Sequence, residues 1–195
     1  MLGVSFFFVL SGFVLAYSAP SRDSAGNFWL RRIARIYPMH LATALAAIAL
    51  APLWPVPAAP AGGAGTAANL LLISSCGRTR TQILNPVSWS LTCEAFFYAC
   101  FPLMLRAVQH VRSASWLYAL LGAVIGATIV QPALATGWHV QRDLRFYPPA
   151  RLSEFVAGLM LAVLVRRGQW RGPGIPAAAV VTLGGYILAS HVTQQ

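Results

Sequence analysis

The sequence predicts an all-α fold, a polytopic bundle of transmembrane helices. Hydrophobic residues make up 57% of the 195-residue chain and charged residues only 9%, well below the ~25% charge of a soluble domain. Several apolar segments approach the ~20 residues that a helix needs to cross a bilayer. We therefore expect one integral-membrane domain, residues 1–195, with about six spans and one short interfacial or re-entrant helix.

The first two spans are expected near the start of the chain. Residues 3–19 form the first, in which Ser11 and Gly12 allow a neighbouring helix to approach closely. A polar segment, residues 21–36, then leads to a second span at residues 38–56, because Pro38 suits the first turn of a helix.

The remaining segments follow from apolar length and from breakers. Residues 51–65 contain four prolines and three glycines and predict a loop. Residues 67–75 are apolar but too short to span, and are typical of an interfacial or re-entrant helix. The other four spans are expected at residues 86–105, 114–131, 151–165 and 175–190.

The charge of the chain fits a membrane topology better than a nucleic-acid partner. The net charge is +10, but the arginines cluster between apolar segments, so we expect no nucleic-acid binding. Nine arginines fall on one side of the predicted topology and five on the other, and the positive-inside rule places the nine, including Arg31–Arg35, in the cytoplasm. Residue 1 then lies outside the cytoplasm, which leads us to expect a truncated chain.

Glu94 is the most informative residue, because it places a carboxylate inside an expected span. Such a charge costs about 2.5 to 3.5 kcal/mol on insertion scales and persists where it has a partner and a use. Ser90, Glu94 and Tyr98 share one helical face at four-residue spacing, and Pro102 leaves the Tyr98 carbonyl without its helical hydrogen bond. Two roles remain open: a polar cavity at an active site, or a structural ion pair with an arginine.

Other charged groups have alternative interpretations. Arg31, Arg32 and Arg35 lie within about one helical turn and suit either phosphate groups or lipid headgroups. Arg151 and Glu154, three residues apart, form either a self-satisfying pair or a second polar patch. The four histidines have no carboxylate partner in sequence, so no Ser-His-Asp arrangement is predicted, and the three cysteines form no metal-binding pattern.

Four motifs occur in a recognisable order: GVSFFFVLSGFVLAY (3–17), FWLRRIARIYPMHL (28–41), WSLTCEAFFYACFPLML (89–105) and RLSEFVAGLMLAVL (151–164). In these the chain resembles the membrane acyltransferase-3 family, integral-membrane O-acyltransferases that modify bacterial glycans. The resemblance implies an enzyme of the bacterial inner membrane with no bound cofactor. It would take an acyl group from cytoplasmic acyl-CoA, expected to be acetyl-CoA, and pass it to a hydroxyl of a cell-surface or secreted glycan.

The resemblance also implies roles for individual residues. The basic motif of the family corresponds to Arg31, Arg32 and Arg35 and implies donor binding, and the family glutamate corresponds to Glu94, with Tyr98 in a supporting catalytic role. Further motif residues without an assigned role are Ser11, Gly12, Trp89, Ser90, Phe97, Arg151 and Glu154.

One departure from the family pattern limits the functional prediction. The general-base histidine of the family precedes the first motif and has no counterpart here. We therefore expect this chain to be an incomplete fragment that does not catalyse acyl transfer on its own. The alternative function is a polytopic transporter or flippase, in which Glu94 is a substrate or proton site.

Overall fold

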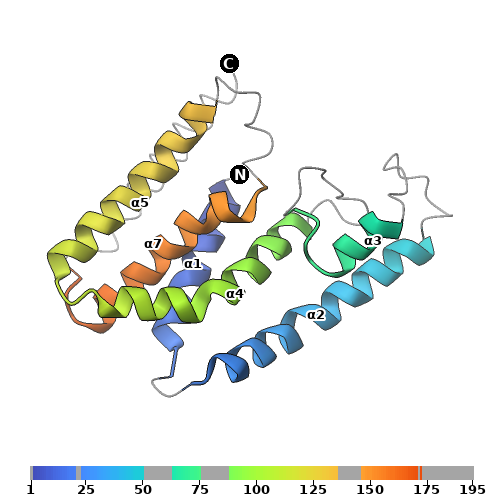
Figure 1. The fold of residues 1–195 in the computed structure, drawn as a ribbon, viewed down its shortest axis with the longest axis horizontal. Helices are drawn as coiled ribbons and strands as arrows, with labels where there is room; N and C mark the ends of the chain where they lie inside the picture. The colour runs from blue at the N-terminus through green and yellow to red at the C-terminus, as the bar shows by residue number, and fades with distance from the viewer. Residues whose placement is uncertain are drawn as a thin grey trace.

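Six α-helices make up the part of the chain that the computed structural model describes, residues 2–20, 23–50, 63–75, 88–135, 146–170 and 172 (Figure 1). This agrees with the all-α prediction. The helices are α1 (Leu2–Ser18), α2 (Ala25–Leu50), α3 (Gly63–Leu70), α4 (Ser88–His110), α5 (Ala114–Ala135) and α7 (Pro148–Arg166).

Three of the six predicted spans are matched by helices long and apolar enough to cross a membrane: α2, α4 and α7. Within the described residues, α1 and the segment Ala114–Thr128 of α5 are apolar but shorter. The predicted span at residues 175–190 lies outside the described residues. The chain therefore has several apolar helices, as an integral multi-pass membrane protein would.

The predicted start of the second span at Pro38 is wrong. Helix α2 already begins at Ala25, and Pro38 lies inside it. The Ser24 hydroxyl accepts a hydrogen bond from the Asn27 backbone N–H at 3.2 Å, so the helix is capped there. A proline removes one helical hydrogen bond, which a long membrane helix tolerates.

The short helix also differs from its predicted position. It begins at Gly63, so residues 63–65 are helical rather than loop, and residues 51–62 lie outside the described part. It ends in a turn, in which the Ile73 N–H donates to the Ala68 carbonyl at 2.9 Å and Leu72 has a φ of 57°. Residues 71–75 are therefore not a continuation of the helix.

The core is built on α7, which packs against α1, α4 and α5. The contact with α1 depends on two glycines. A Cβ on Gly12 would overlap the Phe155 carbonyl oxygen and lie 3.0 Å from the Phe155 carbonyl carbon. A Cβ on Gly158 would overlap the Val9 carbonyl oxygen and lie 2.9 Å from the Phe13 backbone nitrogen. The close approach expected at Ser11-Gly12 is therefore confirmed, and Gly158 is its counterpart on α7.

An ion pair stands at one end of the same contact. Arg151 Nη1 lies 2.5 Å from Glu154 Oε1 and 3.4 Å from Ser5 Oγ of α1. The Glu154 side chain is only 4% exposed, and its Oε2 atom is buried with no hydrogen-bond partner among the described residues. Arg151 and Glu154 therefore form the predicted pair, which also reaches Ser5 of α1.

The arginine-rich ends of the helices meet at the other end of the bundle. They gather at the lower left of Figure 1, where α1 and α7 end and α2 begins. Arg166 Nη1 donates to the carbonyls of Ala16 and Ala19 at 3.0 and 3.2 Å, and so satisfies the carboxyl end of α1. Arg167 does the same for α4, donating to the Val111 and Gln109 carbonyls at 2.6 and 2.8 Å.

Candidate active site

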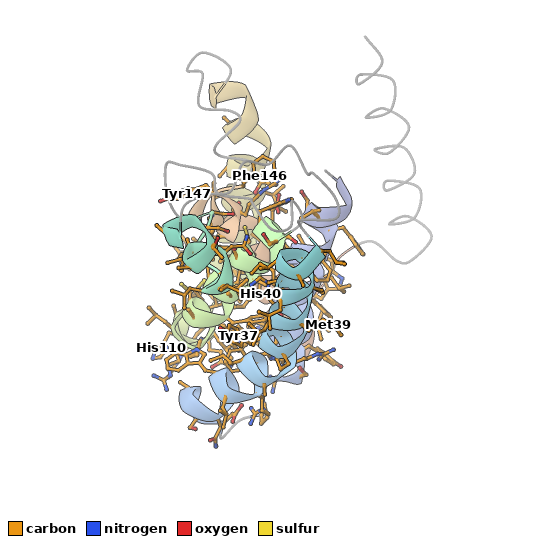
Figure 2. The ribbon with its side chains drawn as sticks, turned by 90° about the vertical axis from the view of Figure 1, so that its right-hand side faces the viewer. Tyr37, Met39, His40, His110, Phe146 and Tyr147 are labelled. Atoms are coloured by element: carbon orange, nitrogen blue, oxygen red, sulfur yellow. The ribbon has the colours of Figure 1, made fainter. Side chains whose placement is uncertain are left out.

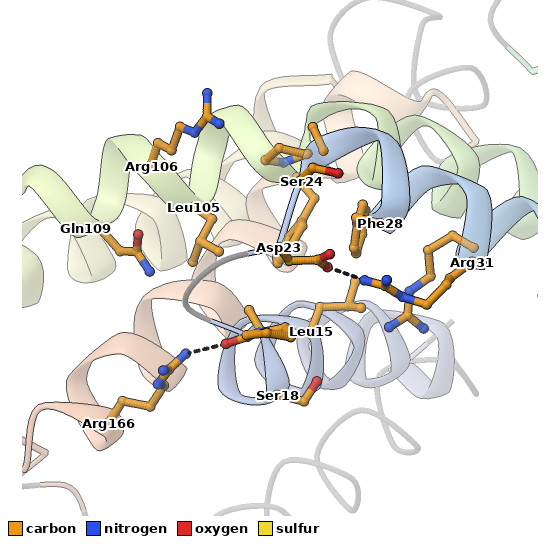
Figure 3. Close-up of a pocket in the computed structure, with 16 residues that line it drawn as sticks. Leu15, Ser18, Asp23, Ser24, Phe28, Arg31, Leu105, Arg106, Gln109 and Arg166 are labelled. Atoms are coloured by element: carbon orange, nitrogen blue, oxygen red, sulfur yellow. Dashed lines mark hydrogen bonds and ion pairs between the residues drawn. The ribbon is translucent and has the colours of Figure 1, made fainter.

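A cavity of about 490 Å³ lies at this arginine-rich end, between α1, the start of α2, the second half of α4 and the end of α7 (Figure 3). Its volume is in the range of small-molecule binding sites. Four arginines line it: Arg31 and Arg32 from α2, Arg106 from α4 and Arg166 from α7. Apolar side chains, including those of Phe28 and Phe101, complete its walls. The arrangement suits an anionic ligand that also carries apolar groups.

Three arginines were predicted to bind acyl-CoA, and only two of them line this cavity. Arg31 is exposed and forms an ion pair with Asp23, which also lines the cavity (Figure 3). Arg32 is half-buried, and its Nε atom is buried without a hydrogen-bond partner among the residues that the structure describes. Arg35 does not line the cavity; its charge instead acts on the Glu94 carboxylate.

Arg32 connects the cavity to the polar face of α4. Its guanidinium carbon lies 5.5 Å from the ring centroid of Phe28 and 5.8 Å from that of Tyr98, both within cation–π range. The Phe28 and Tyr98 rings meet edge to face at 6.2 Å. A single side chain therefore joins the cavity wall to one of the two residues predicted to be catalytic.

A hydrogen bond fixes α2 against α4 next to this contact. Because Pro102 cannot donate to the Tyr98 carbonyl, that oxygen is available, and the Trp29 indole N–H donates to it at 3.0 Å. The proline in α4 thus creates an acceptor that α2 uses. This explains how α2, which has few buried residues, keeps a defined position.

Glu94 is buried, with 7% of its surface exposed. Arg32 and Arg35 are close enough for their charges to act on its carboxylate. Among the described residues, however, none forms an ion pair or a hydrogen bond with it, so the structural ion pair predicted as one alternative is not found there. Tyr98 also lies within electrostatic range of Glu94, and the Ser11 side chain of α1 lies close to the Tyr98 phenol. Three helices thus contribute polar groups to one region.

Two predicted motif residues, Trp89 and Phe97, belong to the buried hydrophobic core. Phe97 is fully buried and packs on Phe8 and Phe155, with ring centroids 5.1 and 5.0 Å away. Trp89 packs edge-on against Phe146 at 4.9 Å. Ser90 is half-buried on the same helix as Glu94. Arg151 and Glu154 lie at the α1–α7 contact described above, away from the residues that line the cavity.

Six polar residues of the cavity were not predicted from the sequence: Ser18, Asp23, Ser24, Arg106, Gln109 and Arg166. A signal for two of them was present, because the charge count placed Arg106 and Arg166 on the same side of the membrane as Arg31. Their convergence on one cavity depends on how the helices pack, which the count does not contain.

A second buried polar group lies where α2, α3 and α4 meet. Figure 2 labels His40, which lies on α2. Its Nε2 lies 2.9 Å from the Asn69 carbonyl oxygen, and Asn69 Nδ2 donates to Ser88 Oγ at 3.2 Å. All three residues are buried. His40 therefore packs α3 against α2, and it does not line the cavity.

Comparison with known proteins identifies the family. The profile of the acyltransferase 3 family, described as an acyltransferase domain, matches residues 1–194. The acyltransferase MdmB of Streptomyces mycarofaciens is 38% identical over 203 aligned residues, which cover 95% of this chain and 52% of that protein. The chain thus spans about half the length of this curated relative. No solved structure matches the chain. Because the family profile covers nearly the whole sequence, the chain belongs to the acyltransferase 3 family.

Proposed function

We propose that the protein is a membrane-bound O-acyltransferase that transfers an acyl group from acyl-CoA, expected to be acetyl-CoA, to a hydroxyl of a cell-surface or secreted glycan. Family membership and the relative named an acyltransferase support the reaction class. The observation that carries the proposal is the arginine-lined cavity, from which Arg32 reaches the Tyr98 ring beside the buried Glu94.

The donor end of the site would be the cavity. Coenzyme A carries several phosphate groups, and guanidinium groups bind phosphate through paired, charge-assisted hydrogen bonds. Arg31 and Arg32 stand on the cavity wall, and no residue in the described part of the chain accepts a hydrogen bond from the buried Nε of Arg32. A buried hydrogen-bond donor without an acceptor costs about 1 to 3 kcal/mol, and a hydrogen bond to a phosphate oxygen would offset this cost. Arg35, further along α2, would not bind acyl-CoA; its charge would instead stabilise the Glu94 carboxylate.

The transfer end would be the polar region around Glu94 and Tyr98. In the reaction the acceptor oxygen forms a bond to the thioester carbonyl carbon. The carbon–sulfur bond breaks with its electron pair on sulfur, and the proton lost by the hydroxyl ends on that sulfur, so the products are an ester and free coenzyme A thiol. Glu94 and Tyr98 provide an acceptor and a donor of hydrogen bonds in a region otherwise packed with aromatic rings. We assign them to ordering the acceptor hydroxyl and the reacting carbonyl.

The location that fits this arrangement is the bacterial inner membrane, with the arginine-rich end in the cytoplasm. Arginines from α2, α4 and α7 meet at one end of the helices, in accord with the positive-inside rule. Acyl-CoA is a cytoplasmic metabolite, so the cavity would open on the side where the donor is present.

The test is transfer of radiolabel from acetyl-CoA to glycan in membranes that contain the intact protein. Wild-type membranes should label the glycan. Glu94→Gln should lower kcat by about 100-fold or more, with the amount of protein unchanged. Arg32→Gln should act mainly on the KM for acetyl-CoA. Arg112→Gln, which removes an exposed arginine outside the cavity, is the matched control. A protein that transports substrate without labelling it would contradict the proposal, as would an unchanged kcat for Glu94→Gln.

A further inference from the structure

One acidic side chain stands among the arginines of the cavity. Asp23 is the single acid among the described residues that line it. It forms an ion pair with Arg31, and its side chain is 16% exposed, compared with 56% for Arg31 (Figure 3). The carboxylate therefore lies on the inner side of the pair. It occupies a guanidinium that would otherwise be available to a ligand.

On the opposite wall, the Arg106 guanidinium has no hydrogen-bond or ion-pair partner among the described residues. Arg166 is bound to the carbonyls at the end of α1. Arg106, on α4, is exposed, and its guanidinium forms no hydrogen bond or ion pair with any residue that the structure describes. In Figure 3 it extends away from the Asp23–Arg31 pair. A long, exposed side chain of this kind can reorient when an anion enters the cavity.

We propose that the cavity is a pocket for the phosphate groups of the acyl donor. Before the donor binds, Asp23 is paired with Arg31, and an incoming phosphate takes the place of the Asp23 carboxylate. Arg106 is a further phosphate ligand. This inference rests on the proposed function, because it takes the ligand to be coenzyme A. A carboxylate and a phosphate present similar oxygen acceptors to a guanidinium, but the phosphate carries more charge and more acceptors. Coenzyme A also carries more than one phosphate, so Arg31 and Arg106 can each bind a phosphate oxygen from their own side of the cavity.

Two substitutions should change the affinity for coenzyme A in opposite directions. Asp23→Asn removes a negative charge that opposes an incoming phosphate, so the Kd should fall about five-fold at low ionic strength. Salt should shrink this gain, because exposed charges are screened. Arg106→Gln removes a phosphate ligand, so the Kd should rise about ten-fold. Asp23→Glu keeps the charge and should bind as the wild type does.

The experiment is titration calorimetry on the purified intact protein in detergent micelles, with coenzyme A and with pantetheine as probes. Pantetheine carries no phosphate, so none of the charge substitutions should alter its binding. Arg112→Gln is the matched control for Arg106→Gln, since it removes an exposed arginine that does not line the cavity. Should Arg106→Gln not fold, Arg106→Ser tests the same contact.

The outcomes separate this inference from the proposed function. Tighter binding by Asp23→Asn together with weaker binding by Arg106→Gln supports it. Weaker binding by Asp23→Asn would mean that Asp23 only orients Arg31, and would overturn it. The same holds if both variants bind coenzyme A as Arg112→Gln does, while the proposed function would stand. A wild-type protein that binds no coenzyme A would overturn both.

Discussion

The α1–α7 pair and the α2–α4 pair are held together by different kinds of contact. Helices α1 and α7 touch through their backbones, because Gly12 and Gly158 leave no side chain between them. Helices α2 and α4 meet through a few side chains, and the Trp29 indole and the Arg32 guanidinium supply the specific contacts. The first pair has no room for a ligand. The second borders the cavity at its arginine-rich end, where the ends of α1 and α7 also line it.

The difference shows how a membrane helix bundle divides stability from binding. Helices that touch through their backbones order few side chains when they pack, so they lose little side-chain entropy and form a rigid pair. Contacts through long polar side chains leave groups such as the Arg32 Nε without protein partners, and these groups are available to a ligand. Substitutions in α1–α7 should therefore lower stability, whereas substitutions in α2–α4 should mainly change binding.

The largest effect is expected at the glycine contact. Gly12→Ala places a Cβ on the Phe155 carbonyl, so the two helices must separate, and the free energy of unfolding should fall by more than about 3 kcal/mol. Unfolding by SDS in mixed micelles, followed by circular dichroism, measures it. Gly126→Ala in α5 is the control, because nothing lies within 4 Å of its Cβ. Equal stability of the two variants would contradict the assignment of a backbone contact.

The ion pair between Arg151 and Glu154 should have the next largest effect. Arg151→Met leaves Glu154 buried without its partner, so the free energy of unfolding should fall by about 3 kcal/mol. Replacing both residues by methionine should recover most of that loss, because the buried charge is then gone. The same SDS titration measures both variants. A double variant no more stable than Arg151→Met would argue against the pair.

A smaller loss is expected where α2 is attached to α4. Trp29→Phe keeps the ring but removes the donor to the Tyr98 carbonyl, so the free energy of unfolding should fall by about 1 kcal/mol. Trp116→Phe, at a tryptophan that is 67% exposed, is the control and should change nothing. Thermal unfolding in detergent compares the two. Identical midpoints would show that the hydrogen bond does not hold the helices together.

The smallest change in stability is expected at Arg32. Arg32→Gln removes two cation–π contacts, which should cost about 0.5 to 1 kcal/mol. Its affinity for coenzyme A should fall about ten-fold, since a phosphate ligand is lost. Parallel thermal unfolding and calorimetry give both numbers. A large loss of stability with unchanged affinity would contradict the claim that substitutions in α2–α4 mainly change binding.

Much of the fold followed from the sequence because apolar length and small residues act locally. The apolar segments at residues 3–19, 86–105, 114–131 and 151–165 each correspond to a helix within a few residues. The error at Pro38 has a physical origin: the first-turn preference of proline is a weak signal. A long helix that Ser24 caps upstream continues through it.

The candidate site was less predictable than the fold. Glu94 could be singled out because a charge inside an apolar segment is costly, and Arg32 because it lies within about one helical turn of Arg31 and Arg35. The link between them was not visible, since it depends on the Tyr98 ring lying against α2. Asp23 carries no sequence signal of its own, and the charge count indicated for Arg106 only its side of the membrane. They became candidates only because separate helices place them around one cavity.

Pro102 has a consequence for how mutations combine. An alanine there would return an N–H to the helix, and the Tyr98 oxygen would gain an acceptor role within α4 itself. The indole of Trp29 would then be redundant, so its loss should do less harm when position 102 is alanine than when it is proline. Two residues from distant parts of the chain would thus show epistasis through a single carbonyl group.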